Sequence, residues 1–372
     1  MFKMPISFKK PKGMSLKGLI RSIFLSSLFV GKRGLTGIDL GSHTIKILKL
    51  SDNNSELINF RTTILPEGAN LEDIKKDDLI ILAIKKLVEQ LNVKKTEVAV
   101  CLSSHHIIVK KIELPEMGKE ELNDAITAEA EQHIPYSLQE VNLDYQILRR
   151  TSEDKMEILI AVAKKDVVER YMALFSEAGL RPHVVDIETA ALVNAYEAFY
   201  PEEASVVALV DIGASKINTV ILENTIPIFN TGIPSGGNYL TRQIQHKLNM
   251  NYTQAESLKI NGPSDETLNQ PLQDIFTSVV DEWLTKIKKT LDFFEANYLK
   301  KIDKLILSGG SSKIKDLTDL FSKEIQKPVS IFNPFGKLKY SVKKFNPTHL
   351  EYYMPQMPIA LGLALRKTGE KI

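Results

Sequence analysis

Two stretches of the chain show the same succession of short apolar runs separated by polar turns. Residues 35–50 and 56–65 have the length and composition of strands, and they predict three consecutive strands. The same succession returns at residues 206–210, 217–222 and 227–232. Two copies of one strand unit, far apart in the chain, indicate a duplicated α/β fold with two lobes flanking a cleft.

Apolar residues spaced three and four positions apart predict the helices that accompany these strands. Residues 76–91 form the first such helix. The other predicted helices lie at residues 189–200, 237–248, 252–259, 272–298, 316–325 and 358–366, with a single buried strand at residues 305–307.

A separate unit is predicted between the two strand units. Strands are expected at residues 97–102, 107–114, 142–150, 157–163 and 184–187, and helices at residues 119–134 and 165–178. The β-α-β-β-α-β order within this segment is typical of a small ferredoxin-like sandwich. We therefore expect a leader at residues 1–33, a first lobe from residues 34–95, 180–203 and 355–372, an inserted partner-binding subdomain at residues 96–179, and a second lobe, with its helical subdomain, at residues 204–354.

The composition narrows the class of protein. With 43% hydrophobic and 25% charged residues, the chain resembles an ordinary globular protein. A formal net charge of +2 gives no broad nucleic-acid footprint, so no nucleic acid is expected among the partners. Cys101 is the one cysteine, which excludes an internal disulfide and a cysteine metal cluster and fits a reducing cytoplasm.

The predicted leader is basic, and no acidic residue precedes Asp39. Within it, Leu19, Ile23 and Phe24 belong to a set of apolar residues at helical spacing. A basic amphipathic segment can lie on an anionic membrane surface. A flexible leader ahead of the folded domain is an equally weighted interpretation, and export is a distant third.

The most informative motifs are Asp39-Leu40-Gly41-Ser42 and Asp211-Ile212-Gly213-Ala214-Ser215, each between two predicted strands. Glycine allows close backbone approach to a ligand, and successive N–H groups in such a turn form an anion-binding nest. An aspartate repels phosphate but suits Mg²⁺ or its bound waters. Either motif alone is consistent with a simple hairpin turn. Together they predict one site for a magnesium–nucleotide polyphosphate.

Four further features are candidates for the same site. Lys46 shares a strand face with Thr44 and could bring its cation to the phosphates. Glu188 is the first residue of a predicted helix. Its carboxylate could orient an attacking water, or it could simply interact with the positive end of the helix dipole. Ser308-Gly309-Gly310 follows a buried strand and permits flat backbone contact with a base or sugar, or is an ordinary loop. Lys288 on the long helix could cover the base, or is a surface lysine.

These motifs resemble those of the actin-like ATPases. Gly37-Ile38-Asp39-Leu40-Gly41-Ser42 and Val210-Asp211-Ile212-Gly213-Ala214 are similar to the two phosphate motifs, and Leu307-Ser308-Gly309-Gly310 to the adenosine motif. Asp186-Ile187-Glu188-Thr189 and Pro358-Ile359-Ala360-Leu361-Gly362 resemble the two connecting motifs. The resemblance implies an actin-like (duplicated ribonuclease H-like) α/β fold that binds ATP and Mg²⁺.

The inserted segment narrows the resemblance to the PilM family of type IV pilus assembly proteins. The motifs that carry it are Ile112-Glu113-Leu114-Pro115, Glu129-Ala130-Glu131-Gln132-His133-Ile134-Pro135-Tyr136, Glu140-Val141-Asn142-Leu143-Asp144-Tyr145, Gly236-Gly237-Asn238-Tyr239-Leu240-Thr241 and Thr290-Leu291-Asp292-Phe293-Phe294. The resemblance implies a cytoplasmic protein peripheral to the inner membrane. It also implies a groove in the inserted subdomain that grips the N-terminal peptide of a PilN-like membrane protein, and a link to pilus motor components. The same residues are equally consistent with a role in a competence or secretion pseudopilus.

The resemblance also implies roles for individual residues. Asp39 and Asp211 would hold the magnesium and its waters, and Glu188 and Asp211 would be the catalytic residues. The nucleotide-binding residues would be Asp39, Gly41, Ser42, His43, Thr44, Lys46, Gly213, Ala214, Ser215, Gly236, Gly237, Asn238, Lys288, Gly309, Gly310 and Ser311.

Two departures from the family pattern affect hydrolysis more than binding, so at most a slow ATPase is expected. Lys216 stands where the family pattern has a small hydroxyl residue, and Ser311-Ser312 replaces a glycine-rich continuation. The alternatives are an FtsA-like filament-forming protein and a small-molecule kinase of the same superfamily. The short polar segment 366–372 does not resemble an FtsA-type anchor, and residues 237–272 show no polar cluster for a second substrate.

Overall fold

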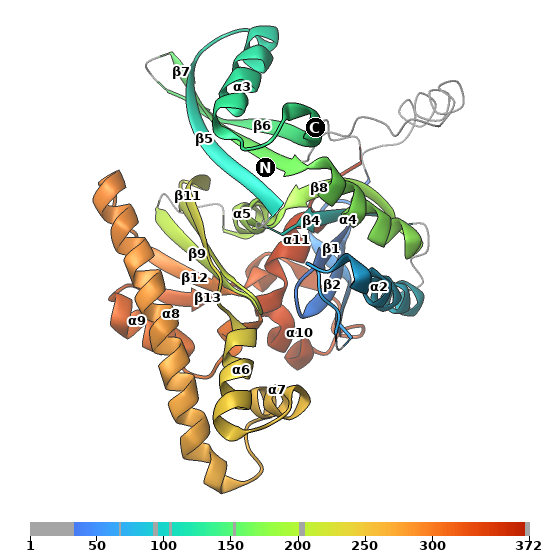
Figure 1. Ribbon diagram of the computed structural model, residues 1–372, viewed down its shortest axis with the longest axis vertical. Helices are drawn as coiled ribbons and strands as arrows, with labels where there is room; N and C mark the ends of the chain where they lie inside the picture. Colours follow the sequence, from blue (N-terminus) through green and yellow to red (C-terminus); the bar gives the residue numbers. More distant parts are fainter. Residues whose placement is uncertain are drawn as a thin grey trace.

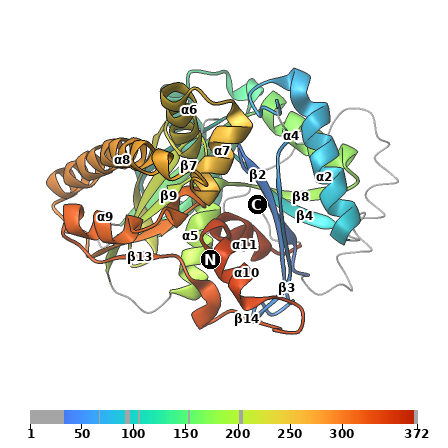
Figure 2. The same cartoon turned by 90° about the horizontal axis from the view of Figure 1, so that it is seen from below.

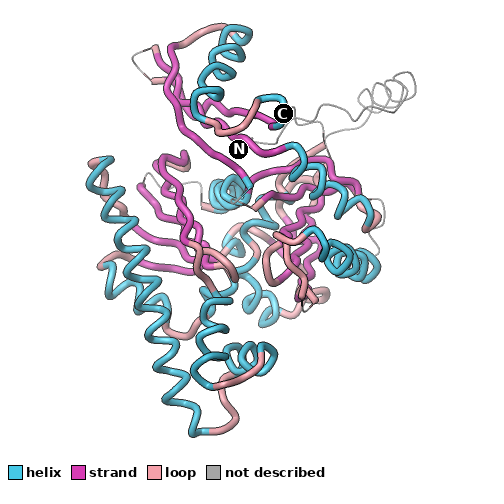
Figure 3. The backbone as a smooth tube through the Cα atoms, in the orientation of Figure 1, coloured by secondary structure: helices cyan, strands magenta, loops and turns pink. Residues whose placement is uncertain are grey.

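The computed structural model describes residues 33–66, 68–91, 96–103, 106–151, 154–200 and 205–368; apart from Arg33, the predicted leader lies outside them. Figure 3 shows the strands gathered into sheets with helices packed around them. Among the helices of this described part, none combines the length and the apolar character needed to cross a membrane.

The first sheet has the strand order β14-β3-β2-β1-β4-β8. Its strands are β1 (Thr36–Leu40), β2 (Thr44–Leu50), β3 (Glu56–Ile64), β4 (Glu97–Leu102), β8 (Arg181–Ile187) and β14 (Lys339–Tyr340). β1, β2 and β3 form the predicted antiparallel meander, whereas β4 pairs in parallel with both β1 and β8. Every residue of β1 is buried, as expected for a strand covered on both faces.

Helices cover both faces of this sheet. α2 (Asp77–Leu91) and α4 (Lys165–Glu177) share one hydrophobic core with it, and α5 (Glu188–Phe199) and α11 (Pro358–Ala364) pack on the opposite face. α2 buries the apolar stripe that its sequence predicts.

The second sheet has the order β11-β10-β9-β12-β13. Its strands are β9 (Val206–Ile212), β10 (Ile217–Glu223), β11 (Ile226–Ile233), β12 (Lys304–Ser308) and β13 (Val329–Ile331). The helices of this lobe are α6 (Gly237–Leu248), α7 (Tyr252–Asn261), α8 (Asn269–Tyr298) and α9 (Leu317–Ile325). The 3₁₀ turns are η1 (Ile74–Lys76), η3 (Leu138–Glu140), η4 (Glu266–Leu268), η5 (Gly310–Lys313), η6 (Pro334–Gly336) and η7 (Met354–Gln356). In Figure 1, α8 runs along the outer side of this lobe.

The two sheets share the layer formed by α5 and α11, which lie between them (Figure 2). The two helices approach closely at Gly362, where a Cβ atom would lie 1.8 Å from the backbone oxygen of Ala191. Only glycine fits there, so the connecting helices form one tightly packed unit beneath the cleft.

The duplication extends to strand register. β1 pairs antiparallel with β2 so that Asp39 lies opposite Lys46, and β9 pairs with β10 so that Asp211 lies opposite Asn218. The first strand of each unit also pairs in parallel with a later strand, β4 or β12. The two lobes are therefore built on the same strand topology, as the repeated sequence pattern predicts.

The ferredoxin-like order predicted for the inserted segment is wrong. β5 (Ile107–Pro115), β6 (Val141–Arg150) and β7 (Lys155–Lys164) form a three-stranded antiparallel sheet, and α3 (Lys119–His133) packs on it. The strands at the two ends of the segment, β4 and β8, pair with each other in the first sheet. Local sequence order does not reveal which sheet a buried strand joins.

Residues 334–353 also lie differently from the predicted second lobe. β14 pairs with β3, and α10 (Pro347–Tyr353) follows it. Leu338, Phe345 and Leu350 are buried in the core of α5 and α11. The segment crosses to the first lobe because its apolar residues complete that core.

We expect replacement of Asp144 with asparagine to remove part of the pH dependence of stability. Burial is the main cause that raises the pKa of Asp144, on β6, from 3.8 to about 6. The folded state therefore binds this proton more tightly than the unfolded state, and the wild-type protein loses stability as pH rises from 3.8 to about 6. Asp144→Asn should lack this loss and be the more stable form at pH 7. Urea unfolding at pH 4 and pH 7 measures the difference, and an equal loss in both proteins contradicts it.

Candidate functional site

A cleft of about 1510 Å³ lies between the two lobes. Both Asp-Gly turns, the start of α6, α7 and the loop after β12 line it. The predicted site residues that the structure brings together here are Asp39, Gly41, Ser42, His43, Thr44, Lys46, Glu188, Asp211, Gly213, Ala214, Ser215, Gly237, Asn238, Gly309, Gly310 and Ser311.

Two predicted residues do not line this cleft. Lys288 lies on the part of α8 that meets α9, and its ammonium donates to the backbone oxygen of Glu324 at 3.2 Å. Its predicted place over the base is therefore wrong, because the helix turns this position away from the cleft. Gly236 instead supports the second turn, since a Cβ there would lie 2.4 Å from the backbone oxygen of Gly213.

The two Asp-Gly turns have the same backbone geometry. Gly41 donates its N–H to the oxygen of Thr44 at 3.1 Å, and Gly213 donates to Lys216 at 2.9 Å. A Cβ at either glycine would lie 3.0 or 3.1 Å from that acceptor oxygen. Each turn is therefore a tight hairpin that brings its backbone into the cleft, as the motif predicts.

Asp39 and Lys46 form an ion pair at the end of β1, with 2.6 Å between the Lys46 Nζ and an Asp39 carboxylate oxygen. Burial alone would lower the pKa of Lys46, but the attraction and hydrogen bond of Asp39, aided by Asp211, raise it. Lys46 therefore stays a cation among the acids of both lobes, where it can meet an anionic ligand.

Asp211 is the acid of the second turn and is 8% exposed. It accepts a hydrogen bond of 2.7 Å from the hydroxyl of Ser308, at the end of β12. Burial raises the pKa of Asp211 to about 6, against the opposing effects of Ser308 and Lys46. A desolvated carboxylate of this kind gains most when a cation approaches it.

Glu188 lies at the floor of the cleft, at the start of α5. It forms a buried ion pair with Lys216, which comes from the second turn. The Lys216 Nζ also donates to the hydroxyl of Ser103, at the end of β4, at 2.8 Å. Lys216 therefore joins the second lobe to two elements of the first.

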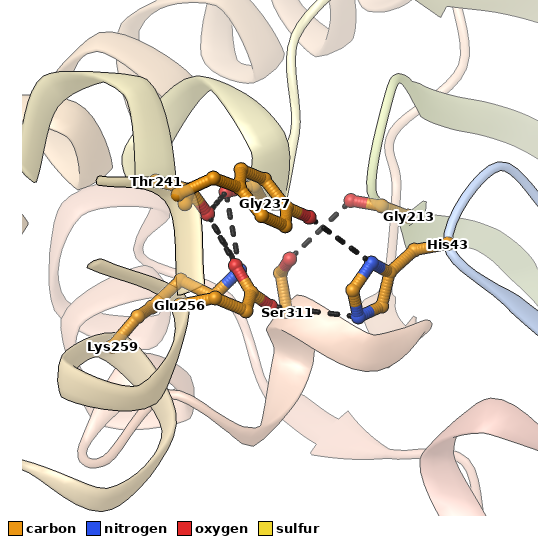
Figure 4. Close-up of polar contacts among 8 residues, drawn as sticks. His43, Gly213, Gly237, Thr241, Glu256, Lys259 and Ser311 are labelled. Atoms are coloured by element: carbon orange, nitrogen blue, oxygen red, sulfur yellow. Dashed lines mark hydrogen bonds and ion pairs between the residues drawn. The ribbon is translucent and has the colours of Figure 1, made fainter. Parts of the chain in front are cut away.

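His43, in the first turn, contacts α7 of the opposite lobe (Figure 4). Its Nε2 lies 3.5 Å from Glu256, and its Nδ1 lies 3.4 Å from the hydroxyl of Tyr252. Burial lowers the pKa of His43, although the nearby Glu256 carboxylate opposes this. The cleft is thus bridged at its mouth by hydrogen-bonding groups from both lobes.

Glu256 and Lys259 are cleft residues that the sequence analysis missed. Glu256 accepts from the hydroxyl of Thr241 and from the Lys259 ammonium, both at 2.6 Å. Their Glu-x-x-Lys spacing places both on one face of α7. That spacing, on a helix following the second turn, was the available signal.

Lys313 and Tyr352 form a second group that the sequence analysis missed. The Lys313 ammonium lies 3.7 Å from the centre of the Tyr352 ring, and both residues line the cleft beside Gly310. Burial lowers the pKa of Lys313 to about 8. Tyr352 could not be assigned from sequence because α10 crosses between the lobes.

The acids of the cleft suit magnesium only together with a nucleotide. Within the described ranges, no group of three or more His, Cys, Asp or Glu side chains is placed to hold a metal ion. Mg²⁺ commonly keeps several waters and binds through one or two carboxylates plus phosphate oxygens. Asp39 and Asp211, with the two glycine turns beside them, supply the one or two carboxylates that such a site needs.

Comparison with known proteins identifies the family. The family model for "type IV pilus assembly protein PilM" matches residues 37–368. The chain belongs to the PilM family. A solved PilM-PilN type IV pilus biogenesis complex is similar, with 26% identity and a TM-score of 0.81 over 90% of this chain and 99% of the matched chain. The predicted family is confirmed.

Two other proteins are similar over most of their lengths. The cell division protein FtsA of Buchnera aphidicola is 23% identical over 365 residues, or 81% of this chain and 85% of the relative. The ethanolamine utilization protein EutJ of Carboxydothermus hydrogenoformans has a TM-score of 0.54 at 14% identity, covering 90% of each chain. The actin-like fold predicted from the paired turns is confirmed.

The PilM family match spans both turns, the loop after β12 and the inserted sheet. The cleft therefore lies within the part of the chain that the family model matches. Lys216 is buried in that cleft rather than exposed to solvent, with 8% of its surface accessible.

Proposed function

We propose that this member of the PilM family is a nucleotide-dependent adaptor of a type IV pilus or related pseudopilus. It binds Mg-ATP between its lobes and grips the N-terminal peptide of a PilN-like protein, at the cytoplasmic face of the inner membrane. The observation that carries the proposal is the pair of Asp-Gly turns facing one cleft, in a chain similar to the PilM of a PilM-PilN complex.

Different residues of the cleft bind the phosphates and the magnesium of Mg-ATP. The backbone N–H groups of residues 42–43 and 214–215 bind phosphate oxygens, since the N–H groups of Gly41 and Gly213 already close their own turns, and Lys46 supplies a counter-charge. Asp39 and Asp211 bind the magnesium through its waters. We assign the groups in this way because carboxylates attract the metal cation, whereas N–H groups attract the phosphate anions.

The nucleoside lies toward α7 and the loop after β12. The Glu256 carboxylate and the Lys259 ammonium provide an acceptor and a donor suited to ribose hydroxyls. The backbone from Gly309 to Ser311 offers a flat surface for the base, and the Ser311 hydroxyl donates to the backbone oxygen of Gly213 at 3.3 Å. This hydrogen bond directly connects the proposed nucleoside site with the proposed phosphate site.

A second, narrow groove is the proposed peptide site. It has a volume of about 50 Å³ and lies where the inserted sheet meets α5 and the second sheet. Its lining is mainly apolar: Val109, Lys111, Leu159, Ile187, Thr189, Ala190, Val193, Val220, Pro227, Ile228, Phe229 and Asn230. The proposed peptide site thus lies between the insertion and the second lobe, whereas the family resemblance implies a groove in the insertion.

The strands beside the groove favour an extended peptide. β5 and β11 are both edge strands of their sheets. An edge strand has backbone N–H and C=O groups available for an added strand, and apolar pockets then select the side chains. An N-terminal peptide with apolar residues at alternate positions matches this surface.

An ion-pair network spans the two sides of this groove. Arg149 on β6 binds Glu157 with two hydrogen bonds of 2.8 and 2.9 Å and reaches Glu223 of the second lobe at 3.2 Å. Lys111 also pairs with Glu157, and Lys300 with Glu223. The network supports a coupling in which movement of the lobes on nucleotide binding changes the width of the groove.

We expect Val109→Arg to weaken binding of the PilN-like N-terminal peptide by at least about tenfold, because a buried guanidinium without a partner costs well over 1.4 kcal/mol. Val109 is partly exposed, so the fold should tolerate the change. Calorimetric titration of the full chain with the peptide, in the presence of Mg-ATP, Mg-ADP or no nucleotide, measures the affinity.

The matched control is Val342→Arg, at a valine that is 69% exposed and lies outside the groove. It should bind the peptide as the wild type does. Absence of peptide binding in every nucleotide state would overturn the adaptor proposal, and normal binding by Val109→Arg would overturn the assignment of the groove. ATP-dependent sedimentation of polymers without peptide binding would support the FtsA-like alternative instead.

A further inference from the structure

Lys216 makes a contact that the duplicated architecture does not require. In the first lobe, Lys46 lies opposite Asp39 in the strand register and pairs with it. The position opposite Asp211 in the second lobe is Asn218, so Lys216 is not the counterpart of Lys46. It lies two residues earlier, and its side chain crosses to the other lobe.

The surroundings of Lys216 fix its ammonium on Glu188. The side chain is buried, and its Nζ contacts the Glu188 carboxylate and the Ser103 hydroxyl at the floor of the cleft. Ser103 and Glu188 both follow buried strands of the first sheet, so neither can move far without disturbing the core. A buried pair of this kind is costly to break by removing one partner.

We propose that Lys216 holds Glu188 in this ion pair and thereby makes the cleft retain ATP with slow hydrolysis. The inference rests on the proposed nucleotide site and deepens it. In hydrolysis, a water oxygen would bond to the γ-phosphorus, the bond from that phosphorus to the ADP oxygen would break, and a water proton would pass to a carboxylate. Glu188 lines the cleft and would take that proton, but its Oε2 contacts the Lys216 ammonium.

The effect on rate follows from the role of a general base. A carboxylate already bound to an ammonium is a weaker proton acceptor and has fewer free lone pairs to orient water. The Glu188 carboxylate would thus no longer serve as a proton acceptor, while the two turns would still bind the phosphates. The same bridge also ties the second turn to β4 and α5 before any nucleotide binds.

Lys216→Thr tests the inference. Phosphate release at saturating Mg-ATP should rise at least about tenfold, since a well-placed general base contributes about 10²–10⁴. The affinity for a fluorescent ATP analogue should change by less than about threefold, or well under 1.4 kcal/mol. Lys216→Arg should keep the slow rate, and Lys216→Thr combined with Glu188→Gln should return to it.

Hydrogen exchange of the nucleotide-free protein gives a readout independent of turnover. Residues 213–216 and the first turn of α5 should exchange faster in Lys216→Thr than in wild type, while Lys289→Thr on α8 should leave them unchanged. Unchanged phosphate release by a folded, nucleotide-binding Lys216→Thr protein would overturn the inference. A tenfold or greater loss of affinity would do the same, since Lys216 would then be a phosphate ligand. Failure of the wild type to bind nucleotide would overturn the proposed function as well.

Discussion

Replacing Arg366 with methionine should lower the free energy of unfolding by about 3–5 kcal/mol, because it removes the cation of a buried ion pair and keeps the buried carboxylate. Arg366 follows α11, and its guanidinium donates to one oxygen of Asp186 at 2.8 Å and 2.5 Å. Both side chains are 0% exposed. The pair joins the end of one connecting helix to the strand that leads into the other, so its loss should also loosen the layer beneath the cleft.

Guanidinium chloride unfolding, followed by circular dichroism, measures this change. The double variant Arg366→Met with Asp186→Leu is the matched control, since replacing a whole buried ion pair by apolar side chains is often neutral or stabilising. It should recover most of the lost stability. A loss of less than about 1 kcal/mol in Arg366→Met would mean that the pair contributes no more than an exposed one.

The elements of the two lobes could be predicted from sequence because their patterns are local. The meander of β1, β2 and β3 and its copy in the second lobe each combine short apolar runs with tight turns, and both lie where predicted. The helix predicted at residues 272–298 is α8, which begins three residues earlier. These predictions rested on the spacing of apolar residues and on the residues that favour tight turns.

The errors arose where distant segments decide the structure. Nothing in the sequence of β4 or β8 distinguishes a strand of the first sheet from a strand of the insertion, because each ends in a short, largely apolar buried run. The crossing of α10 to the first lobe depends on Leu350 filling a core made by α5 and α11. Such pairings are properties of the assembled molecule.

In the candidate site, too, residues in local motifs could be predicted, whereas residues brought together by the fold could not. Motif residues at strand ends, such as Asp39 and Asp211, were found because the same acid and glycine motif recurs between two matching pairs of strands. Glu256 and Lys259 lie on a helix whose cleft-facing side is known only once α7 is placed. Lys216 was noticed as a departure, but its partner Glu188 is 28 residues away and in the other lobe.

Replacing Asp211 with asparagine should weaken Mg-ATP binding by about 10–100-fold, the usual cost of removing a group that orients a metal's ligands. The side-chain amide oxygen can still accept the hydrogen bond from Ser308, so the turn keeps its shape. Without magnesium, affinity for ATP should not fall, because the change removes a negative charge beside the phosphates. Titration with a fluorescent ATP analogue, in magnesium and in excess chelator, separates the two effects.

The control for this experiment is Asp281→Asn, at an exposed position of α8 outside the cleft. It should match the wild type in both conditions. Asp39→Asn is a poorer probe, because it also removes the charged partner of the half-buried Lys46 and so disturbs the folded cleft. If Asp211→Asn weakened binding equally with and without magnesium, the carboxylate would be shaping the turn rather than serving the metal. A loss of affinity that appears only with magnesium distinguishes the two roles, since a carboxylate that binds the metal strengthens Mg-ATP binding without favouring free ATP.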